Sequence, residues 1–344
     1  MEKNALLSIV VPCYNSETYL EKTLSMLVSQ GLEDVEIIVV NDGSVDNTKE
    51  MADSFAKKYS QFKVLTHCEN GIWVSGESNS GLGLAKNRGM SAARHSGLYS
   101  TKGKYVYFLD SDDTLIEGTL DFFRKTISAN PNIDGFVFGY EAIIDGVKTK
   151  TYNSKNPKDL GLQNNIFDKY LSKKLQCNIC SVIFSVSYLQ NHDIAFFKEK
   201  VTGEDISFLV SAFAFAKSIY YSNRICFRYQ IRRDSIMQGY RKYGIFHTTG
   251  VLAVKKTIEG LISQKTDYEK KLNFFMAMYY VYNLKSYLTA RLPEKEKSEP
   301  INKVFIENKY LLNKKMKGRF LFKCIIFCIK IFPLKLMFQI FGKI

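Results

Sequence analysis

Apolar runs alternate with amphipathic segments along the first 125 residues. Four runs are apolar at almost every position and end in polar residues: 6–15, 35–44, 62–67 and 104–110. The intervening segments at 16–30, 46–60 and 83–96 are predicted to be helices, as the helical spacing of Leu20, Leu24 and Leu27 illustrates. Continuous apolar strands that alternate with helices are typical of a mostly parallel sheet covered on both faces. The pattern therefore predicts an α/β fold.

Polar residues follow three of these predicted strands. They are "PCYN" (12–15), "NDGS" (41–44) and "DSDD" (110–113). The carboxyl ends of parallel strands lie at one edge of a sheet, so these segments are expected to converge on one cleft. In the first two segments Ser16 and either Ser44 or Asp46 are candidate helix caps, and Asp42 is a candidate acceptor for a planar group such as a nucleobase. The alternative for 41–48 is a turn followed by a cap.

Three carboxylates, Asp110, Asp112 and Asp113, lie together after the fourth strand. They repel one another unless a cation compensates their charge. Mg²⁺ and Mn²⁺ prefer oxygen ligands and are commonly held by one or two carboxylates together with substrate phosphates. A solvated loop with a helix N-cap is the alternative.

Chemistry is also predicted in the second half of the chain. The segment "TGEDISFLVSAF" is a glycine turn followed by a helix, which would hold the Asp205 carboxylate at the helix N-terminus. Favourable interaction of Glu204 and Asp205 with the helix dipole is the alternative. Residues 241–312 show apolar stripes at helical spacing and predict helices. Neither G-x-G-x-x-G after the first strand nor a P-loop motif occurs, so dinucleotide and P-loop sites lose their main support.

Composition and charge limit the class of protein. A hydrophobic content of 46% over 344 residues supports a packed core of one large or two ordinary domains. Seven scattered cysteines and no signal-peptide pattern indicate a reducing cytoplasm. The C-x-x-C pair Cys177 and Cys180 has no second pair, so both cysteines are expected in the core rather than at a metal. The net charge is +14, and no nucleic-acid-binding motif accompanies it.

The basic charge is concentrated at the end of the chain. From Lys314 onward there are seven Lys, one Arg and no acid, interleaved with Phe, Ile and Leu. The longest apolar run there, Cys324–Ile329, is far shorter than the ~20 residues that a spanning helix needs. Residues 313–344 are therefore predicted to form a basic amphipathic tail, interrupted at Pro333, that lies on an anionic membrane surface. A buried helix or a helix for a partner subunit is the alternative.

Six segments, in this order, resemble the family 2 glycosyltransferases, which have a GT-A fold. They are "SIVVPCYNSETYLEKTLSMLVSQ", "EIIVVNDGSVDNT", "NSGLGLAKNRG", "GKYVYFLDSDD", "GEDISF" and "RYQIRRDSIM". The resemblance covers about residues 5–238. It implies a catalytic domain over 1–240, with a nucleotide-sugar half (1–125) and an acceptor half (126–240). A helical extension over 241–312 and the tail then follow.

The resemblance also implies roles for individual residues. Asp205 matches the catalytic base, Asp110 and Asp112 match the ribose and metal carboxylates, and Glu204 lies in the acceptor region. The nucleotide would be bound by Pro12, Tyr14, Asn15, Asp42, Ser44, Lys86 and Asp110, and the diphosphate would be bordered by Arg232 and Ser235. Two features depart from the family: Lys86 replaces the usual Arg and loses bidentate geometry, and residues 69–78 with Trp73 look inserted, as a lid, a sugar platform or a plain surface loop.

The predicted function is inverting, metal-dependent transfer of a sugar from a nucleotide-sugar, a UDP-sugar by resemblance, to a growing bacterial surface glycan. Mn²⁺ or Mg²⁺ is the expected cofactor, and the acceptor is expected to be carried on a polyprenyl diphosphate. The expected location is the cytoplasmic face of the membrane, without nucleic acid as a partner. Two alternatives remain. "VYFLDSDDTL" also fits the first motif of haloacid-dehalogenase-like phosphatases, with Asp110 as nucleophile, and a non-catalytic membrane scaffold is the other.

Overall fold

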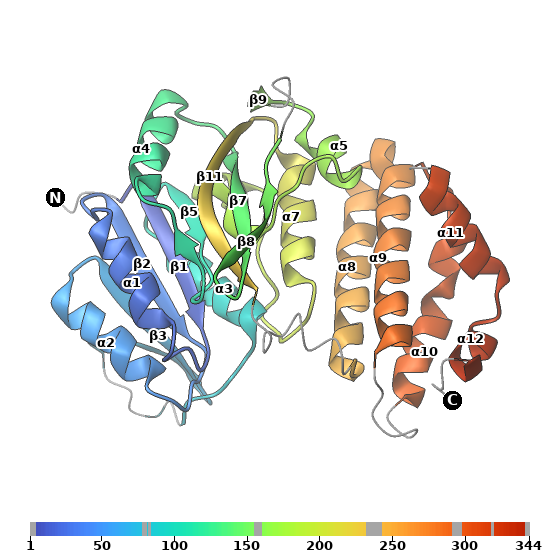
Figure 1. The fold of residues 1–344 in the computed structure, drawn as a ribbon, viewed down its shortest axis with the longest axis horizontal. Coiled ribbons are helices and arrows are strands. Elements are labelled where there is room, and N and C mark those ends of the chain that lie inside the picture. The colour runs from blue at the N-terminus through green and yellow to red at the C-terminus, as the bar shows by residue number, and fades with distance from the viewer. Residues whose placement is uncertain are drawn as a thin grey trace. The chain divides into compact units, whose positions relative to one another are not determined.

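The computed structural model describes residues 5–77, 81, 84–154, 160–231, 243–290, 298–317 and 320–340. The chain forms two compact units. The first consists of Met1–Ile166, Gln176–Lys200 and Phe215–Ile231, and the second of Phe167–Leu175, Val201–Ala214 and Arg232–Ile344. In their described parts, the first unit is a sheet with helices on both faces and the second consists mainly of helices (Figure 1).

The described residues of the first unit include an 11-stranded mixed sheet, whose main path runs β4-β3-β2-β1-β5-β10-β7-β11-β6. The strands on this path, in chain order, are β1 (Leu7–Cys13), β2 (Val35–Asn41), β3 (Phe62–Cys68), β4 (Gly71–Val74), β5 (Tyr105–Phe108), β6 (Thr114–Leu115), β7 (Gly135–Ile144), β10 (Val182–Ser185) and β11 (Ile219–Ile231). Off the path, β8 (Val147–Tyr152) pairs with β7 and β9 (Gly161–Gln163) pairs with β11.

The centre of the sheet is parallel, as the apolar runs predict. Strands β3, β2, β1 and β5 are adjacent and parallel, with Ile9 opposite Ile37 on one side and Tyr107 on the other. Every residue of β1 and β5 is buried, which explains why these strands are continuously apolar rather than alternating. The predicted α/β fold and its four N-terminal strands are confirmed.

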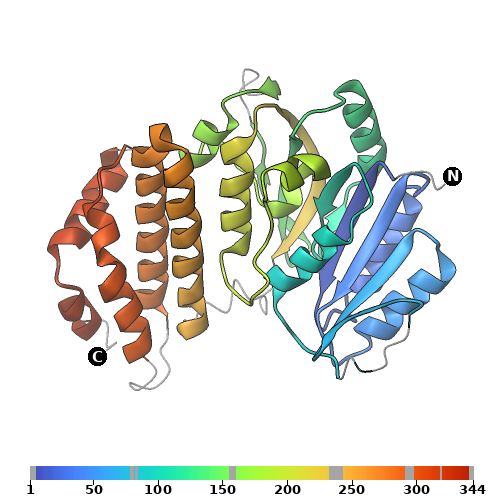
Figure 2. The same cartoon turned by 180° about the vertical axis from the view of Figure 1, so that it is seen from behind.

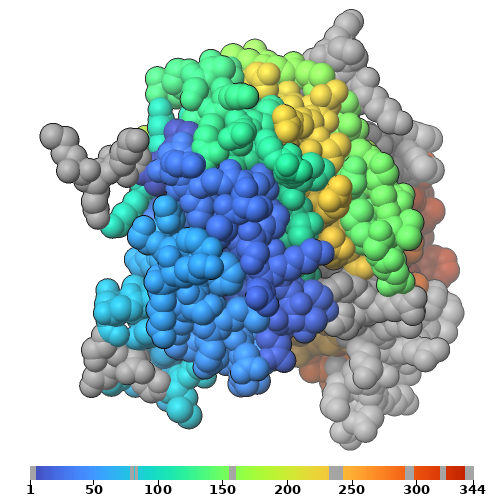
Figure 3. Space-filling view, turned by 60° about the vertical axis from the view of Figure 1, so that its left-hand side comes forward, coloured from blue at the N-terminus to red at the C-terminus, as the bar shows by residue number. Residues whose placement is uncertain are grey.

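Beyond β5 the sheet becomes mixed. β10 runs antiparallel to both β5 and β7, whereas β7 and β11 are parallel to each other. The short strand β6, which follows the carboxylate segment, pairs antiparallel with β11. In Figure 3 β11, in yellow, lies between the bright green of β8 and the teal segment that contains β6 and α4. The chain that leaves β5 is therefore fixed to β11.

Helices cover both faces of the sheet. Figures 1 and 2 show α1 (Leu20–Ser29), α2 (Thr48–Lys58) and α4 (Thr119–Ala129) on one face, and α3 (Met90–Tyr99) and α6 (Val186–Asn191) on the other. The 3₁₀ helix η2 (Ile179–Ser181) leads directly into β10. This arrangement buries both surfaces of the parallel strands and leaves their carboxyl ends as the place for a site.

The start of the first helix differs from its prediction. α1 begins at Leu20, and Ser16 does not cap it through its side chain. The Ser16 carbonyl accepts hydrogen bonds from the Tyr19 and Leu20 N–H groups, while its hydroxyl lies 2.9 Å from Ser111 Oγ. The Ser16 side chain therefore contacts the carboxylate segment after β5 instead of capping α1.

The inserted segment after β3 forms a hairpin. Residues 71–74 form β4, which pairs antiparallel with β3 at the edge of the sheet. Lys49 Nζ lies 4.1 Å from the centroid of the Trp73 ring, over its face, and Trp73 Nε1–H donates to the Glu77 carbonyl at 2.9 Å. Trp73 is therefore held by α2 and by its own hairpin.

The described part of the second unit consists mainly of helices: α7 (Glu204–Phe215), α8 (Ile245–Gln264), α9 (Glu269–Thr289), α10 (Glu299–Asn308), α11 (Phe320–Ile331) and α12 (Leu334–Ile340), with the last turns of α5 (Ile166–Leu171). The 3₁₀ helices η4 (Thr266–Tyr268) and η6 (Lys309–Asn313) join some of them. Buried aromatic rings fill the core, with Tyr287 and Phe305 stacked at a centroid distance of 5.5 Å. Tyr280 Oη donates to the Phe305 carbonyl at 2.7 Å, so this buried hydroxyl is satisfied.

The tail forms two short helices. α11 ends at Ile331 and α12 begins at Leu334, which confirms the break predicted at Pro333. Ile326 and Leu334 are buried, whereas Phe327 and Ile331 are 60% and 62% exposed. Lys323, Lys330 and Lys335 are also exposed. Part of the tail therefore packs onto the unit, and part presents apolar and basic side chains outward.

Candidate active site

The loops after β1 and β2 are tied together at the carboxyl edge of the sheet. Pro12 is buried near the end of β1, whereas Tyr14 is 46% exposed. The Asn15 N–H donates to Ser44 Oγ at 3.0 Å, and Asn15 Oδ1 accepts from the Val45 N–H at 3.0 Å. Asn15 has a φ of 48°, a left-handed conformation that Asn tolerates better than most residues. The two loops thus form one rigid rim beside Tyr14.

The carboxylate of Asp42, at the end of β2, is buried and surrounded by donors. Its Oδ1 accepts from the Arg88 N–H at 2.8 Å, and its Oδ2 accepts from the Gly89 N–H at 2.7 Å and from Asn87 Nδ2 at 2.9 Å. Residues 87–89 donate to this carboxylate and are not helical, so α3 begins at Met90 rather than at the predicted position near 83. We call residues 86–89 the Asp42 strap.

His67 completes the surroundings of Asp42. Its Nδ1 lies 2.7 Å from Asp42 Oδ1, and its Nε2 lies 2.9 Å from Ser96 Oγ in α3. A neutral imidazole with its proton on Nδ1 satisfies both contacts, because it donates to the carboxylate and accepts from the serine. The chain Asp42–His67–Ser96 therefore links the end of β2 to β3 and α3.

Lys86 is the first residue of the strap. Its backbone N–H donates to the His67 carbonyl at 2.9 Å, and its side chain is exposed. A Cβ at Gly43 would lie 2.3 Å from the Lys86 carbonyl carbon, so only glycine lets the β2 loop approach the strap this closely. Close packing against the strap therefore explains the glycine of the "NDGS" motif in this chain.

The segment after β5 is fixed through its backbone. Thr23 Oγ1 donates to the carbonyls of Ser111 and Asp113, at 2.9 and 3.1 Å. The Asp113 N–H donates to the Asp110 carbonyl at 3.0 Å, which closes a tight turn. Asp112 lies at this turn and is partly exposed. The sequence from Asp110 to Asp113 is thus held in one conformation by α1 and by its own turn.

The carboxylates of this segment have very different surroundings. Asp110 Oδ1 accepts from Arg94 Nη2 at 2.6 Å. Asp113 is fully buried, and its Oδ1 accepts from the Gln230 N–H of β11 at 2.9 Å. Its Oδ2 is buried and has no hydrogen-bond partner among the described residues. Burial, followed by the charges of Asp110 and Asp112, raises the pKa of Asp113 well above its usual range.

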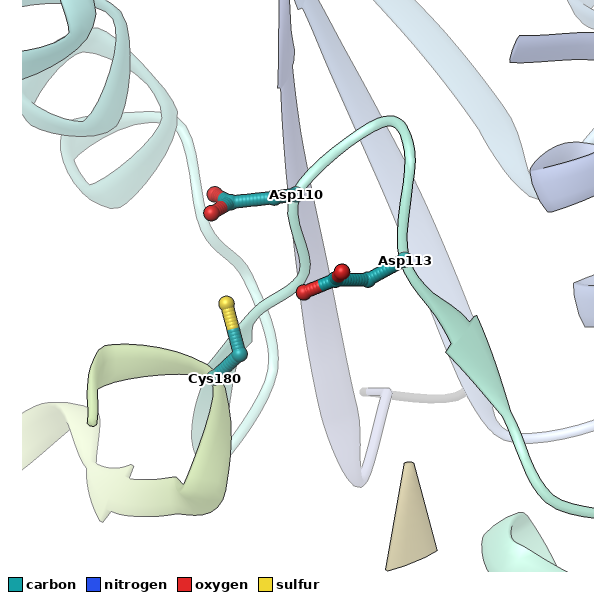
Figure 4. A group of neighbouring side chains, drawn as sticks. All are labelled: Asp110, Asp113 and Cys180. Carbon is teal, nitrogen blue, oxygen red and sulfur yellow. The ribbon is translucent and has the colours of Figure 1, made fainter. Parts of the chain in front are cut away.

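A third group joins Asp110 and Asp113. The Cys180 thiol, in η2, is buried, and the ligand atoms of the three side chains lie within 4.8 Å of one another. Figure 4 shows the two carboxylates and the thiol directed toward a common space. Burial and the neighbouring carboxylates raise the pKa of this thiol, so it is neutral here.

This arrangement fits a divalent cation. The buried Asp113 Oδ2 has no described partner, which is costly, and three carboxylates within one turn offer the oxygen ligands that a divalent ion prefers. The sequence pattern identified the segment and its three carboxylates, and the family resemblance selected Asp110 and Asp112 from them. Cys180, which was assigned to the core, is buried beside Asp110 and Asp113. Arg94 was not singled out, because its contact with Asp110 depends on the packing of α3.

Asp205 lies in the second unit, in the first turn of α7, directly after Glu204. Both side chains are partly exposed, and Asp205 Oδ1 accepts from the Ile206 N–H at 2.8 Å. The predicted position at a helix N-terminus is confirmed. Arg232 and Ser235 lie outside the described residues.

Comparison with known proteins identifies similar chains. Residues 8–86 and 82–190 match the model of "Glycosyl transferase family 2". EpsH of Bacillus subtilis (strain 168), named as a glycosyltransferase, is 28% identical over 79% of this chain and 74% of its own. A Campylobacter jejuni protein named GalNAc(5)-diNAcBac-PP-undecaprenol beta-1,3-glucosyltransferase is 29% identical over 82% of this chain and 84% of its own.

The fold is also similar to that of a solved structure. The crystal structure of S. aureus TarS residues 1–349 in complex with UDP-GlcNAc superposes with a TM-score of 0.66. The match covers 89% of this chain and 81% of that one at 18% sequence identity, so it concerns the fold. The predicted GT-A architecture is confirmed by this likeness.

Proposed function

The chain belongs to glycosyl transferase family 2, and we propose that it is an inverting, metal-dependent enzyme that transfers a sugar from a UDP-sugar to a growing bacterial surface glycan. The observation that carries the proposal is the carboxylate group after β5, where the buried Asp113 Oδ2 has no described partner beside Asp110. A departing nucleoside diphosphate needs its charge neutralised, and a divalent ion held by these carboxylates would supply that charge.

The donor would bind along the carboxyl ends of β1, β2 and β5. Tyr14 is exposed there and offers its ring to the uracil, while Pro12, Asn15 and Ser44 shape the rim. Asp42 is saturated by its own strap, so its contribution to the nucleotide is to hold Lys86 and the strap in position. The TarS structure contains UDP-GlcNAc, which supports a UDP-sugar for this chain as well.

The residues that would hold the divalent ion are Asp112 and Asp110, and the Asp113 carboxylate lies beside that of Asp110. Bound Mn²⁺ or Mg²⁺ would supply Lewis-acid stabilisation of the leaving diphosphate. Arg94 Nη2 donates to Asp110 at 2.6 Å and so fixes the orientation of that carboxylate. Arg232 and Ser235 are proposed at the border of the diphosphate, from the family resemblance.

Asp205 is proposed as the general base. A sugar hydroxyl has a very high pKa, and a carboxylate that removes its proton in the transition state contributes ~10²–10⁴-fold to the rate. One base and one departing diphosphate imply a single displacement at the anomeric carbon, with inversion and no covalent enzyme intermediate. Glu204, the preceding residue, is proposed to face the acceptor.

The acceptor is proposed to be a glycan carried on a polyprenyl diphosphate. The name of the Campylobacter jejuni relative, which contains "PP-undecaprenol", supports such a carrier. Among the described residues, no helix combines the length and the apolarity that a membrane crossing requires. We propose that α11 and α12 instead lie on the cytoplasmic face, with Phe327 and Ile331 inserted and Lys323, Lys330 and Lys335 near anionic headgroups.

The two alternatives are not favoured. A haloacid-dehalogenase-like phosphatase would use Asp110 as nucleophile, but here Asp110 is held by Arg94 in a chain whose residues 8–190 match family 2. A trapped phosphoaspartate and phosphate release without a nucleotide would support that reading. A non-catalytic scaffold would hydrolyse no nucleotide-sugar at all.

The function is tested by incubating the protein with Mn²⁺ and a panel of nucleotide-sugars, including UDP-glucose, UDP-GlcNAc and their GDP counterparts. We expect slow hydrolysis of one UDP-sugar to free UDP, lost when the metal is chelated. Asp205→Asn should keep UDP affinity and lose ~10²-fold or more in turnover. Near-normal turnover in this variant would remove Asp205 from the mechanism.

The membrane proposal has its own test. A chain shortened after Asn313 should stay folded, keep donor hydrolysis and lose sedimentation with anionic phosphatidylglycerol liposomes at low salt. A matched variant, Lys323→Gln with Lys330→Gln and Lys335→Gln, should bind such liposomes more weakly, because each basic group near the surface contributes ~1 kcal/mol before screening. Aggregation of the shortened chain, or indifference of the full chain to the liposomes, would mean that the tail is core.

A further inference from the structure

The loop that leads into Asp205 is docked on helix α8. The Thr202 N–H donates to Thr249 Oγ1 at 3.1 Å, and Thr202 Oγ1 donates to the His247 carbonyl at 3.2 Å. Thr249 Oγ1 in turn donates to the Phe246 carbonyl at 2.6 Å. The Thr249 hydroxyl is therefore oriented by its own helix, so that its lone pair faces the backbone of the loop.

Two glycines make this close approach possible. Gly203 has a φ of 67°, and a Cβ there would lie 2.3 Å from Tyr279 Oη of α9. A Cβ at Gly250 of α8 would lie 2.5 Å from Thr202 Oγ1 and 2.8 Å from Tyr279 Oη. A glycine inside a helix costs roughly 1 kcal/mol relative to alanine. Gly250 is accounted for by the space that the docked loop requires.

The same loop sets the start of α7. The Gly203 carbonyl accepts from the Ser207 N–H at 3.0 Å, which places residue 203 at the beginning of the first helical turn. Asp205 lies in that turn, two residues after Gly203. A shift of the docked loop would therefore move the Asp205 carboxylate with it. For a catalytic group, a misplacement of about 1 Å can cost ~10²-fold in rate.

We propose that Thr249, through the docked loop, is a positioning residue for Asp205. This inference rests on the proposed role of Asp205 as the base. It gives α8 and α9, which follow the proposed catalytic motifs in the sequence, an indirect part in the reaction through the position of Asp205. Neither helix needs to touch the donor or the acceptor for this, because the contact chain runs from Thr249 to Thr202 and from there along the backbone to Asp205.

The test compares two substitutions of one side chain. Thr249→Val keeps the shape and removes the acceptor for the Thr202 N–H, whereas Thr249→Ser keeps the hydroxyl. With Mn²⁺ and the UDP-sugar that is hydrolysed in the panel, Thr249→Val should lose ~10-fold in kcat, and Thr249→Ser should retain most of it. Calorimetric affinity for UDP with Mn²⁺ should be unchanged in both, because the proposed donor site lies in the other unit. Equal kcat in Thr249→Val and wild type would overturn the proposal.

A double-substitution cycle separates positioning from general destabilisation. In the Asp205→Asn background, Thr249→Val should cause no further loss of turnover, because the group that it positions is already absent. The same ~10-fold loss in both backgrounds would contradict the proposal. If Thr249→Val does not fold, as judged by thermal melting, the pair Thr202→Val and Thr202→Ser tests the other hydrogen bond that docks the loop, from Thr202 Oγ1 to the His247 carbonyl of α8.

The outcomes also distinguish this inference from the proposed function. Normal turnover in Asp205→Asn would remove the base assignment and the positioning role that rests on it, whereas hydrolysis of none of the nucleotide-sugars would remove the proposed function. A strong loss in Asp205→Asn, combined with normal kcat in Thr249→Val and Thr202→Val, would leave the proposed function intact and remove only the positioning role.

Discussion

Two buried carboxylates, Asp42 and Asp113, lie at the ends of strands on either side of β1, and their surroundings are opposite in kind. Asp42 lies within 2.9 Å of four nitrogen donors: the side chains of His67 and Asn87 and the N–H groups of Arg88 and Gly89. Asp113 accepts one hydrogen bond, from the Gln230 N–H, and its Oδ2 has no partner among the described residues. Asp42 therefore has a structural role at the site, whereas we propose that Asp113 faces a ligand.

The physical reason lies in the cost of burying charge. A buried carboxylate is tolerated when donors replace its lost hydration, and it is costly when they do not. Asp42 receives hydrogen bonds from the strap that surrounds it. Asp113 receives one described hydrogen bond, and two further carboxylates lie near it in the sequence. Substitutions at the two positions should therefore have effects of opposite sign on the stability of the metal-free protein.

The largest effect is expected for Asp42→Ala. This change leaves His67, Asn87 and two backbone N–H groups without their acceptor in a buried place. The free energy of unfolding should fall by about 3–5 kcal/mol, because several buried donors lose their acceptor and each unpaired group costs about 1–3 kcal/mol. Urea denaturation without metal measures it. Asp42→Asn, which keeps one acceptor oxygen, should fall between this variant and wild type, and a loss below ~1 kcal/mol in Asp42→Ala would mean that the strap does not depend on Asp42.

Asp112→Ala should next abolish the metal-dependent part of nucleotide binding. Asp112 lies at the turn after β5 and is partly exposed, so its loss should cost little stability. We expect the affinity for UDP in the presence of Mn²⁺ to fall ~100-fold, to the level seen without metal, as loss of a metal contact implies. Calorimetry is the measurement, with the exposed Asp121→Ala as a matched carboxylate control. Unchanged Mn²⁺-dependent affinity would refute the metal assignment.

Asp113→Asn should stabilise the metal-free protein while weakening the metal site. The amide keeps an acceptor for the Gln230 N–H and removes a charge beside Asp110 and Asp112, which is worth about 1–3 kcal/mol. Because the pKa of Asp113 is raised in the folded state, wild type loses stability as pH rises from the ordinary carboxyl range toward that raised value. The advantage of Asp113→Asn should therefore grow with pH and vanish in acid. Thermal melting in EDTA at several pH values measures it, and a destabilised variant at neutral pH would contradict this account.

The smallest effect is expected for His67 and Ser96, which are linked by a hydrogen bond next to Asp42. His67→Gln keeps a side-chain donor near Asp42 and loses the contact with Ser96 Oγ. The free energy of unfolding should fall by about 1 kcal/mol, the usual value of one hydrogen bond. Ser96→Ala should give a similar loss, and the double variant should lose no more than either alone. Additive losses would show that the two side chains act separately.

The sequence predicts the frame of this site better than its interior. The four N-terminal strands, α2 and the segment 110–113 follow from apolar runs and strand-end polarity, because these patterns are local. The start of α3 was predicted six or seven residues too early, since nothing local indicates that residues 87–89 are needed to surround Asp42. The unusual state of Asp113 could not be predicted either. It depends on burial by segments far along the chain, such as β11, whose Gln230 lies 117 positions after Asp113.

The central claim is that the carboxylates after β5 bind a cation together with the donor diphosphate, while Asp42 only supports the site. It is tested most directly by titrating UDP into the full chain by calorimetry, once with Mn²⁺ and once with EDTA. The account predicts that wild type binds UDP at least ~10-fold more tightly with Mn²⁺, and that this difference disappears in Asp112→Ala. Equal affinity of wild type for UDP in Mn²⁺ and in EDTA would contradict the claim.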